Sequence, residues 1–388
     1  MLDTFARATL VVVVPLQLFA LLGDPQHYVL VYFLISCFAL VASMCVPSLI
    51  RKIRHRGTLL LGMCCMMGAA FLLSAQDLYW FVPGLALQLF ASATMAISLN
   101  LYVLRNVPRE EFSRFEPIRI LFAGGAWVIG PSLGVFLEQS IVVWLPYLAA
   151  GLFSFVQLCL FLFLRVDDPV AESPTSAGPA NPIRFLPRYF SQPRLVLAWL
   201  LSVTRAAWWG LFYHIAPVYL LTIGLEKQSI GLVTSLGSAG LLTVIFWGWV
   251  GRRVGLRALL TKAFAFAGLL TVLVAATNGN PLLAACFLIV AAAATSIVDS
   301  CGNVPFLSAV RPHERSEMTT VYATYRDISR VASQGVYTLL LSIFPFTGIF
   351  IAGGGAMILL SLCARKLPRR LGIPKKDRER APVSEFSP

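Results

Sequence analysis

Three ionisable side chains stand deep inside long apolar runs, where a charge is costly and usually serves a purpose. Arg205 lies eleven residues into one run, Asp299 lies eleven residues from the end of another, and Asp327 lies about ten residues into a third. At a helical rise of 1.5 Å per residue, each would sit roughly 15 Å from the end of its helix. Such groups can bind a charged ligand, carry a proton, or form a static pair that fixes helix packing.

The run that holds Asp327 also carries a polar stripe. Its members recur at steps of three or four residues, as on one side of a helix: Tyr322, Arg326, Arg330, Ser333 and Tyr337, with Gln334 beside them. A face of this kind avoids lipid and meets protein or water. We expect Arg326 and Arg330 either to bind an anionic group or to neutralise Asp327 and Asp299.

Aromatic residues follow Arg205 along its run, namely Trp208, Trp209 and Tyr213, and His214 comes next. Aromatic side chains beside an arginine suit a ligand that is partly apolar and carries a negative group. They are equally typical of anchors at a membrane interface. His214 can titrate near neutral pH, although a lone histidine is more often simply hydrogen-bonded.

The composition excludes a water-soluble fold. Of the 388 residues, 58% are hydrophobic and 13% are charged, whereas soluble proteins are about half apolar and about one quarter charged. The eight cysteines have no CxxC spacing, which argues against a metal site or a disulfide framework. A nucleotide loop, paired metal-ligand motif and nucleophile–base arrangement are all missing from the sequence, so we expect neither an enzyme nor a cofactor.

Recurring apolar runs predict an all-α, polytopic membrane protein of about twelve transmembrane helices. The predicted spans are 4–23, 28–50, 58–75, 79–104, 117–137, 141–164, 195–223, 230–250, 258–277, 282–309, 318–344 and 348–364.

The net charge of +13 is concentrated in alternate loops, as it is when Lys and Arg set membrane orientation. One set of loops includes Arg51–Arg56, Arg252–Arg257 and the C-terminal tail, while the opposite set contains Lys227 as its only Lys or Arg. This pattern predicts that both termini are cytoplasmic, and it argues against nucleic-acid binding. The compact loops favour a bacterial inner membrane.

The chain is predicted to consist of two six-helix halves, residues 1–165 and 194–366, joined by a flexible Pro/Ser/Ala-rich cytoplasmic linker, 166–193, and followed by a tail, 367–388. The halves repeat at a steady offset. Arg51, Lys52 and Arg56 match Arg252, Arg253 and Arg257 at 201 residues, Pro15 matches Pro217 at 202, and Pro108 matches Pro312 at 204. Such a duplication is typical of transporter architectures.

One loop motif carries a resemblance to a known family. The segment from Gly248 to Arg257 reads Gly-Trp-Val-Gly-Arg-Arg-Val-Gly-Leu-Arg. It resembles the loop signature of the major facilitator superfamily, which Gly248, Arg253, Gly255 and Arg257 fit, whereas Arg252 replaces the acidic residue. In that family the acid helps to hold one conformation closed. The copy in the first half, Pro47–Arg56, keeps basic residues but has lost both glycines and the acid.

A second motif lies in the predicted fifth helix, where Gly130, Pro131 and Gly134 occur in the order Gly-Pro-Ser-Leu-Gly. It is similar to the glycine–proline motif of exporters in the same superfamily, and it also fits ordinary close packing of membrane helices. The arginine that many drug–proton exporters carry in the fourth helix is absent from 81–104.

The resemblance implies a secondary carrier that works by alternating access. In the resembled fold the seventh and tenth helices line a central cavity, so Arg205 and Asp299 would face each other. We expect a small solute, anionic or amphipathic, with protons or another ion coupled to its movement. Two alternatives stay open: a non-transporting receptor or assembly factor on the same fold, and a membrane-embedded lipid-handling protein.

Overall fold

The computed structural model describes residues 1–106, 112–164, 182–311 and 314–368, and all regular structure within them is helical. Ten helical segments in this part of the chain are long and apolar enough to cross a membrane. Lipid cannot hydrogen-bond to a backbone, so each crossing segment must satisfy its own N–H and C=O groups as a helix. The prediction of an all-α polytopic fold is confirmed.

Two details reconcile these ten segments with about twelve crossings. Helix α2, Pro25–Ser74, contains 50 residues and is interrupted by the non-helical backbone of Arg54, so it makes two crossings. Helices α14, Arg315–Ala323, and α15, Tyr325–Leu341, follow each other directly and make one more. The charged stripe on α15 explains why hydropathy alone does not identify that crossing.

The remaining helices of the first half are α1 (Leu2–Leu22), α3 (Leu78–Asn106), α4 (Phe112–Ser140) and α5 (Leu145–Phe163). Those of the second half are α7 (Pro193–Gly210), η1 (Leu211–Ile215), α8 (Ala216–Thr222), α9 (Lys227–Ala239), η2 (Gly240–Thr243), α10 (Val244–Val254), α11 (Leu256–Ala275), α12 (Pro281–Cys301), α13 (Val304–Ala309) and α16 (Thr347–Ala364).

Local sequence signals fix several helix ends. Gly23 adopts a left-handed conformation, with φ of 71°, and ends α1, because glycine has no Cβ to oppose it. Asp24 then caps α2 by accepting a hydrogen bond from the backbone N–H of His27. Asn280 caps α12 in the same way, followed by Pro281 at the first helical position.

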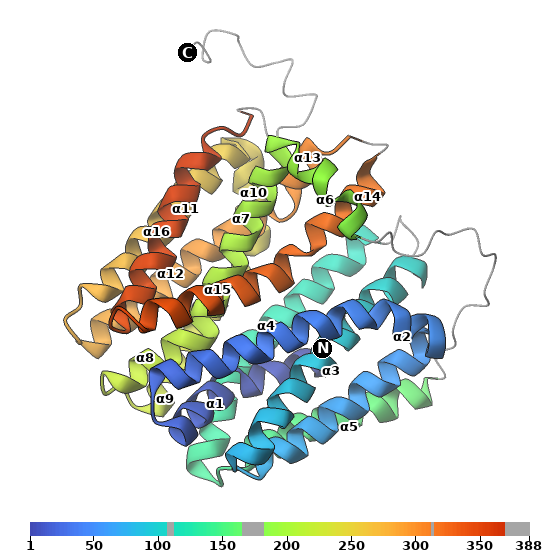
Figure 1. Cartoon of the computed structure of the whole chain (residues 1–388), viewed down its shortest axis with the longest axis vertical. Coiled ribbons are helices and arrows are strands. Elements are labelled where there is room, and N and C mark those ends of the chain that lie inside the picture. Colours follow the sequence, from blue (N-terminus) through green and yellow to red (C-terminus); the bar gives the residue numbers. More distant parts are fainter. Residues whose placement is uncertain (107–111, 165–181, 312–313, 369–388) are drawn as a thin grey trace.

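The helices form two groups that follow the order of the sequence (Figure 1). In the first, α2 packs against α3 and α5, and α1 packs against α4 and α5; in the second, α11 packs against α12 and α16, and α7 packs against α15. The groups meet where α4 contacts α9 and where α2 contacts α15. We call these groups the first half and the second half.

Several polar contacts join the two halves between mid-span and the loops poor in Lys and Arg. Near those loops the ammonium of Lys227 lies 2.7 Å from Glu138. The Ser132 hydroxyl lies 2.7 Å from that of Ser235, and the hydroxyl of Tyr28 donates to the His214 carbonyl at 2.7 Å. Glu138 was assigned to a loop by the sequence, but it lies in α4 with its side chain only 2% exposed.

Helix α6, Pro182–Phe190, occupies the end of the segment predicted to be a flexible linker; residues 166–181 of that segment lie outside the described part of the chain. Arg188 pairs with Glu314 and lies 3.6 Å from Glu317 on α14. The ring of Tyr189 is fully buried in an apolar cluster with residues of α7, α13 and α14. Helix α6 is therefore docked on the second half, a difference from the composition-based expectation.

The docking contact is electrostatically favourable. Burial alone would raise the pKa of Glu314, but a hydrogen bond from Gln192 and the charge and hydrogen bond of Arg188 outweigh that effect and lower the pKa. The carboxylate is consequently charged at neutral pH and attracts the Arg188 guanidinium.

Two corresponding positions of the predicted repeat have a positive φ. Gly255, between α10 and α11, has φ of 96°, and Arg54, which stands 201 residues earlier, has φ of 62° and ψ of 174°. Glycine adopts such angles readily, whereas a residue with a Cβ is strained there. The two positions thus share a positive φ, although only one of them has a glycine.

We expect Arg54→Gly to stabilise the protein by about 1 kcal/mol, because strain of order 1–3 kcal/mol is removed and part is offset by greater chain entropy in the unfolded state. Thermal unfolding in detergent measures the effect as a higher Tm. Lys52→Gly, at a helical position of the same segment, is the matched control and should lower the Tm. An unchanged or lower Tm for Arg54→Gly would contradict the assignment of strain.

Candidate functional site

Arg205 and Asp299 face each other between α7 and α12. The Arg205 Nε lies 3.3 Å from the Asp299 Oδ1, and their side chains are 11% and 21% exposed. Trp209, one turn after Arg205, donates its indole N–H to the Asp299 Oδ2 at 2.8 Å. The two oxygens of one carboxylate are therefore contacted by an ion-pair partner and a hydrogen-bond donor from the same face of α7.

An aromatic cluster continues from this pair. The rings of Trp209 and Tyr213 are stacked, with centroids 5.3 Å apart and an interplanar angle of 17°. The ring of Trp127, on α4 of the first half, approaches that of Tyr213 at 4.7 Å. The Tyr213 hydroxyl lies 3.0 Å from the hydroxyl of Ser238 on α9. The cluster thus spans both halves.

Pro217 explains the local backbone beneath this cluster. It has no N–H, and its ring crowds the carbonyl four residues before it, which belongs to Tyr213. The chain responds with a π-helical segment, η1, in which the Ala216 N–H bonds to the Leu211 carbonyl. Short π segments in α-helices often occur at functional sites. Here the segment carries Tyr213 and His214.

The polar stripe of α15 forms a second cluster. The Ser43 hydroxyl, on α2 of the first half, donates to the Asp327 Oδ2 at 3.2 Å. Arg330 follows Asp327 by three residues on α15, a spacing that places the two side chains side by side. The Arg326 Nε donates to the Tyr325 hydroxyl at 3.2 Å. Tyr325 connects the two clusters, because the Arg205 guanidinium lies 5.9 Å from the centre of its ring.

The rest of the stripe packs internally. Ser333, Gln334 and Tyr337 are buried, and the Tyr322 hydroxyl lies 2.6 Å from that of Ser202.

His214 lies apart from the Arg205–Asp299 pair. Its ring is 5.3 Å from that of Tyr32, and its carbonyl accepts the hydrogen bond from Tyr28. Its contacts therefore belong to the junction between the halves.

The loop motif forms the turn between α10 and α11. Gly255 supplies the required positive φ, and the Arg253 guanidinium lies 4.0 Å from the centre of the Trp249 ring. Gly248 lies within α10, and Arg257 lies in the first turn of α11 with a partly exposed side chain. The side chain of Arg252 lies outside the described part of the structure.

The glycines of the α4 motif permit a very close approach to α1. A Cβ on Gly134 would lie 1.9 Å from the Thr9 carbonyl oxygen, and one on Gly130 would lie 2.5 Å from the Ala8 Cβ. Between them, Pro131 and Ser132 turn toward α9, where the Pro131 carbonyl lies 3.3 Å from the place a Cβ on Gly231 would occupy. The motif therefore serves packing on two sides.

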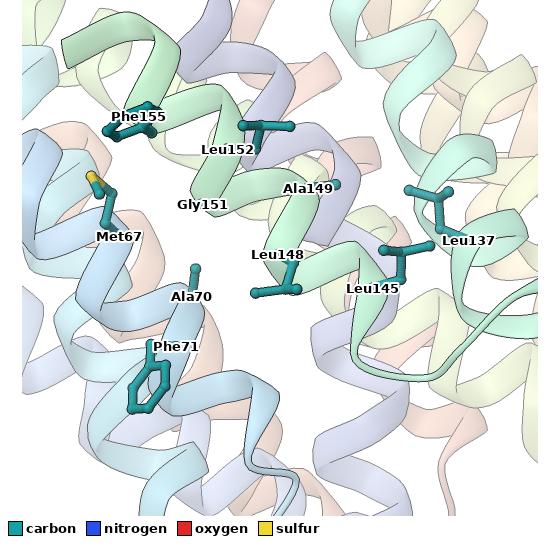
Figure 2. Close-up of a pocket in the computed structure, with 10 residues that line it drawn as sticks. All are labelled: Met67, Ala70, Phe71, Leu137, Leu145, Leu148, Ala149, Gly151, Leu152 and Phe155. Carbon is teal, nitrogen blue, oxygen red and sulfur yellow. The ribbon is translucent and has the colours of Figure 1, made fainter. Parts of the chain in front are cut away.

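The groove in Figure 2 does not belong to this site. It measures about 570 Å³ and is lined by apolar residues of α2, α4 and α5, among them Phe71, Leu148 and Phe155. These three side chains are 74%, 46% and 48% exposed, which fits a surface in contact with lipid. Among the described residues, no cluster of His, Cys, Asp and Glu could hold a metal ion.

Sequence reasoning missed Trp127, Ser43 and Tyr325. Trp127 had a usable signal, because it is a tryptophan in the middle of an apolar run and not at its ends, where interfacial anchors occur. Ser43 and Tyr325 had none, since their roles depend on which helices meet.

Comparison with known proteins places this geometry in a family context. A family model described as Major Facilitator Superfamily matches residues 1–334. No curated protein matches the chain. Among solved structures, a POT family transporter in complex with 5-aminolevulinic acid has a TM-score of 0.74 at 14% identity, covering 93% of each chain. The nucleoside transporter NupG has a TM-score of 0.71 at 14% identity, covering 94% of this chain and 95% of its own.

Proposed function

The chain belongs to the major facilitator superfamily and is a multi-pass membrane transporter, and from this premise we propose that it is a proton-coupled secondary carrier of a small anionic or amphipathic solute. Transport by alternating access needs two halves that move against each other around a site at mid-depth. We assign those halves to residues 1–165 and 194–366. The likeness of the α4 motif to that of family exporters favours export.

The observation that carries the proposal is the Arg205–Asp299 contact of 3.3 Å at mid-span. Charges at this depth are costly, and here both remain partly accessible, at 11% and 21% exposure. An anionic solute can take the place of Asp299 beside Arg205. The released carboxylate then gains a proton, because an unpaired charge in a low-dielectric site is unfavourable. Binding and protonation are thereby linked.

Asp327 is the second candidate for the coupling group. It joins α15 to Ser43 of the first half, so a change in its charge would act on a contact between the halves. The names of the POT and NupG structures specify small solutes, which supports a small solute here. Their sequence identity to this chain is low, so the likeness itself shows only the fold.

We place the basic loops and both termini in the cytoplasm of a bacterial cell, in the inner membrane. The contacts of Lys227 with Glu138 and of Tyr28 with His214 then lie toward the outside, and they favour a conformation that is closed on that side.

Flux measurements in proteoliposomes test the proposal. A panel of small carboxylates is loaded on one side, and a pH gradient of either sign is imposed. We expect at least one of these carboxylates to accumulate under one sign of the pH gradient and not under the other. In Asp299→Asn or Asp327→Asn, we expect accumulation to be lost while exchange of the solute continues. Proton coupling through these residues would be refuted if the accumulation of no carboxylate depended on the pH gradient. It would also be refuted if both variants accumulated the solute normally.

A further inference from the structure

Asp299 shows what kind of ligand the α7 face can hold. Its two oxygens are bound separately, one by the Arg205 guanidinium at 3.3 Å and the other by the Trp209 indole N–H at 2.8 Å. The Arg205 cation and the Trp209 donor lie one helical turn apart on α7 and together bind both oxygens of one carboxylate. A solute carboxylate of the same shape fits the same two donors when Asp299 leaves them.

The second donor also belongs to an aromatic surface. The ring of Trp209 stacks on Tyr213 at 5.3 Å, and Tyr213 in turn contacts Trp127 at 4.7 Å. When the Trp209 N–H binds the carboxylate of a solute, the aromatic rings of this surface therefore lie within one side-chain length of that carboxylate. We call them the aromatic wall. Planar rings gain additional attraction from such a wall through stacked or edge-to-face contacts.

Trp127 differs from the other members of the wall in its origin. It lies on α4 of the first half, whereas Arg205, Trp209 and Tyr213 lie on α7 and η1 of the second. Its side chain is partly exposed, although the residue lies far from both ends of its helix. A ring that contacts Trp127 and a carboxylate that contacts Arg205 would thus make the solute bridge both halves.

We propose that the site takes a small monocarboxylate carrying a planar ring two or three bonds from the carboxylate, and that Trp127 determines this specificity. The inference rests on the proposed function, because it assigns the solute class to the same site. Arg205 and Trp209 bind the carboxylate, Trp127 contacts the ring, and the displaced Asp299 takes up one proton. Tyr213 is buried between Trp209 and Trp127 and supports Trp127. The net charge of the site is then the same with and without solute.

Binding to purified protein in detergent tests the assignment with three probes of similar size. 3-Phenylpropionate has both ring and carboxylate, hexanoate has the carboxylate alone, and 3-phenylpropanamide has the ring alone. Thermal shift as a function of concentration gives the relative affinities. We expect 3-phenylpropionate to bind at least about tenfold more tightly than either of the others.

Substitutions of Trp127 separate specificity from general binding. Trp127→Leu should weaken 3-phenylpropionate by about tenfold and leave hexanoate unchanged, while Trp127→Phe should retain most of the preference. Trp144→Leu, in a loop where the side chain is 43% exposed, is the matched control and should change neither. Arg205→Leu should remove binding of both carboxylates. Size-exclusion profiles identify a misfolded variant. If Trp127→Leu misfolds, Trp127→His replaces it and is expected to weaken 3-phenylpropionate while hexanoate binds as before.

The outcomes distinguish this inference from the function on which it rests. Equal affinity for hexanoate and 3-phenylpropionate, or an equal loss of both in Trp127→Leu, would overturn the role of Trp127. If no ring-containing carboxylate binds while another small anion shows Arg205-dependent flux in proteoliposomes, the solute class is wrong and the carrier function stands. If flux is absent for every anion, the proposed function itself fails.

Discussion

Arg205→Leu and Asp299→Leu are each expected to reduce solute flux at least about 100-fold, and the double variant is expected to recover stability without recovering flux. Each single change leaves one charge without its partner in a low-dielectric region, which costs about 3–5 kcal/mol in comparable buried pairs. The double change removes both charges, so the fold no longer contains an uncompensated one. The anion receptor is still missing, because the guanidinium at 3.3 Å from Asp299 is gone.

The measurement pairs thermal unfolding with initial rates of flux at equal amounts of reconstituted protein. A static pair gives the opposite pattern, with a well-folded double variant that transports normally. That result would reduce Arg205 and Asp299 to a structural contact and direct attention to Arg326, Arg330 and Asp327 on α15. Arg365→Leu, directly after α16 with an exposed side chain and outside both the cluster and the loop motif, controls for loss of a positive charge.

Gly134→Ala is expected to lower the stability of the protein more than most other glycine-to-alanine substitutions in this chain. The added Cβ would stand 1.9 Å from the Thr9 carbonyl oxygen, which is a backbone atom and cannot rotate away. Helices α1 and α4 must then separate, at a cost of about 3 kcal/mol or more. The Tm and the yield of monodisperse protein report the loss.

Gly125→Ala provides the matched control, because it lies on the same helix and a Cβ there meets nothing within 4 Å. It should leave the Tm within a few degrees of that of the parent. Equal stability of the two alanine variants would show that the tight contact between α1 and α4 is not required. Gly130→Ala, where the nearest atom is the Ala8 Cβ at 2.5 Å, should fall between them.

Sequence reasoning reached the architecture because lipid imposes a simple rule. Any crossing segment must be a long apolar helix, and the predicted spans follow the observed helices closely, as with α16 at Thr347–Ala364. Depth counting also predicted that Arg205 and Asp299 lie at similar levels, and they form an ion pair. The count for Asp299 assumed one continuous helix, whereas α12 ends at Cys301 and α13 begins at Val304. The offset of 201 residues aligned Arg54 with Gly255 before their shared positive φ was visible.

The misses have a common cause, because each concerns a partner from a distant segment. Trp127 joins the site through Tyr213 of the other half, and composition cannot reveal which helix faces which. Glu138 was expected in a loop, yet it lies in α4, where Lys227 of the other half compensates its charge at 2.7 Å. The Pro/Ser/Ala-rich composition of the linker did not indicate the helix at its end. That helix is held by a single buried ring, Tyr189, which has little effect on the average composition.

The docking of α6 also changes how the two halves are mechanically connected. Arg188 fixes α6 to α14, and Tyr189 is buried among residues of the second half, so α6 moves with that half. A modification or a partner protein that acts on α6 would therefore act on the second half directly.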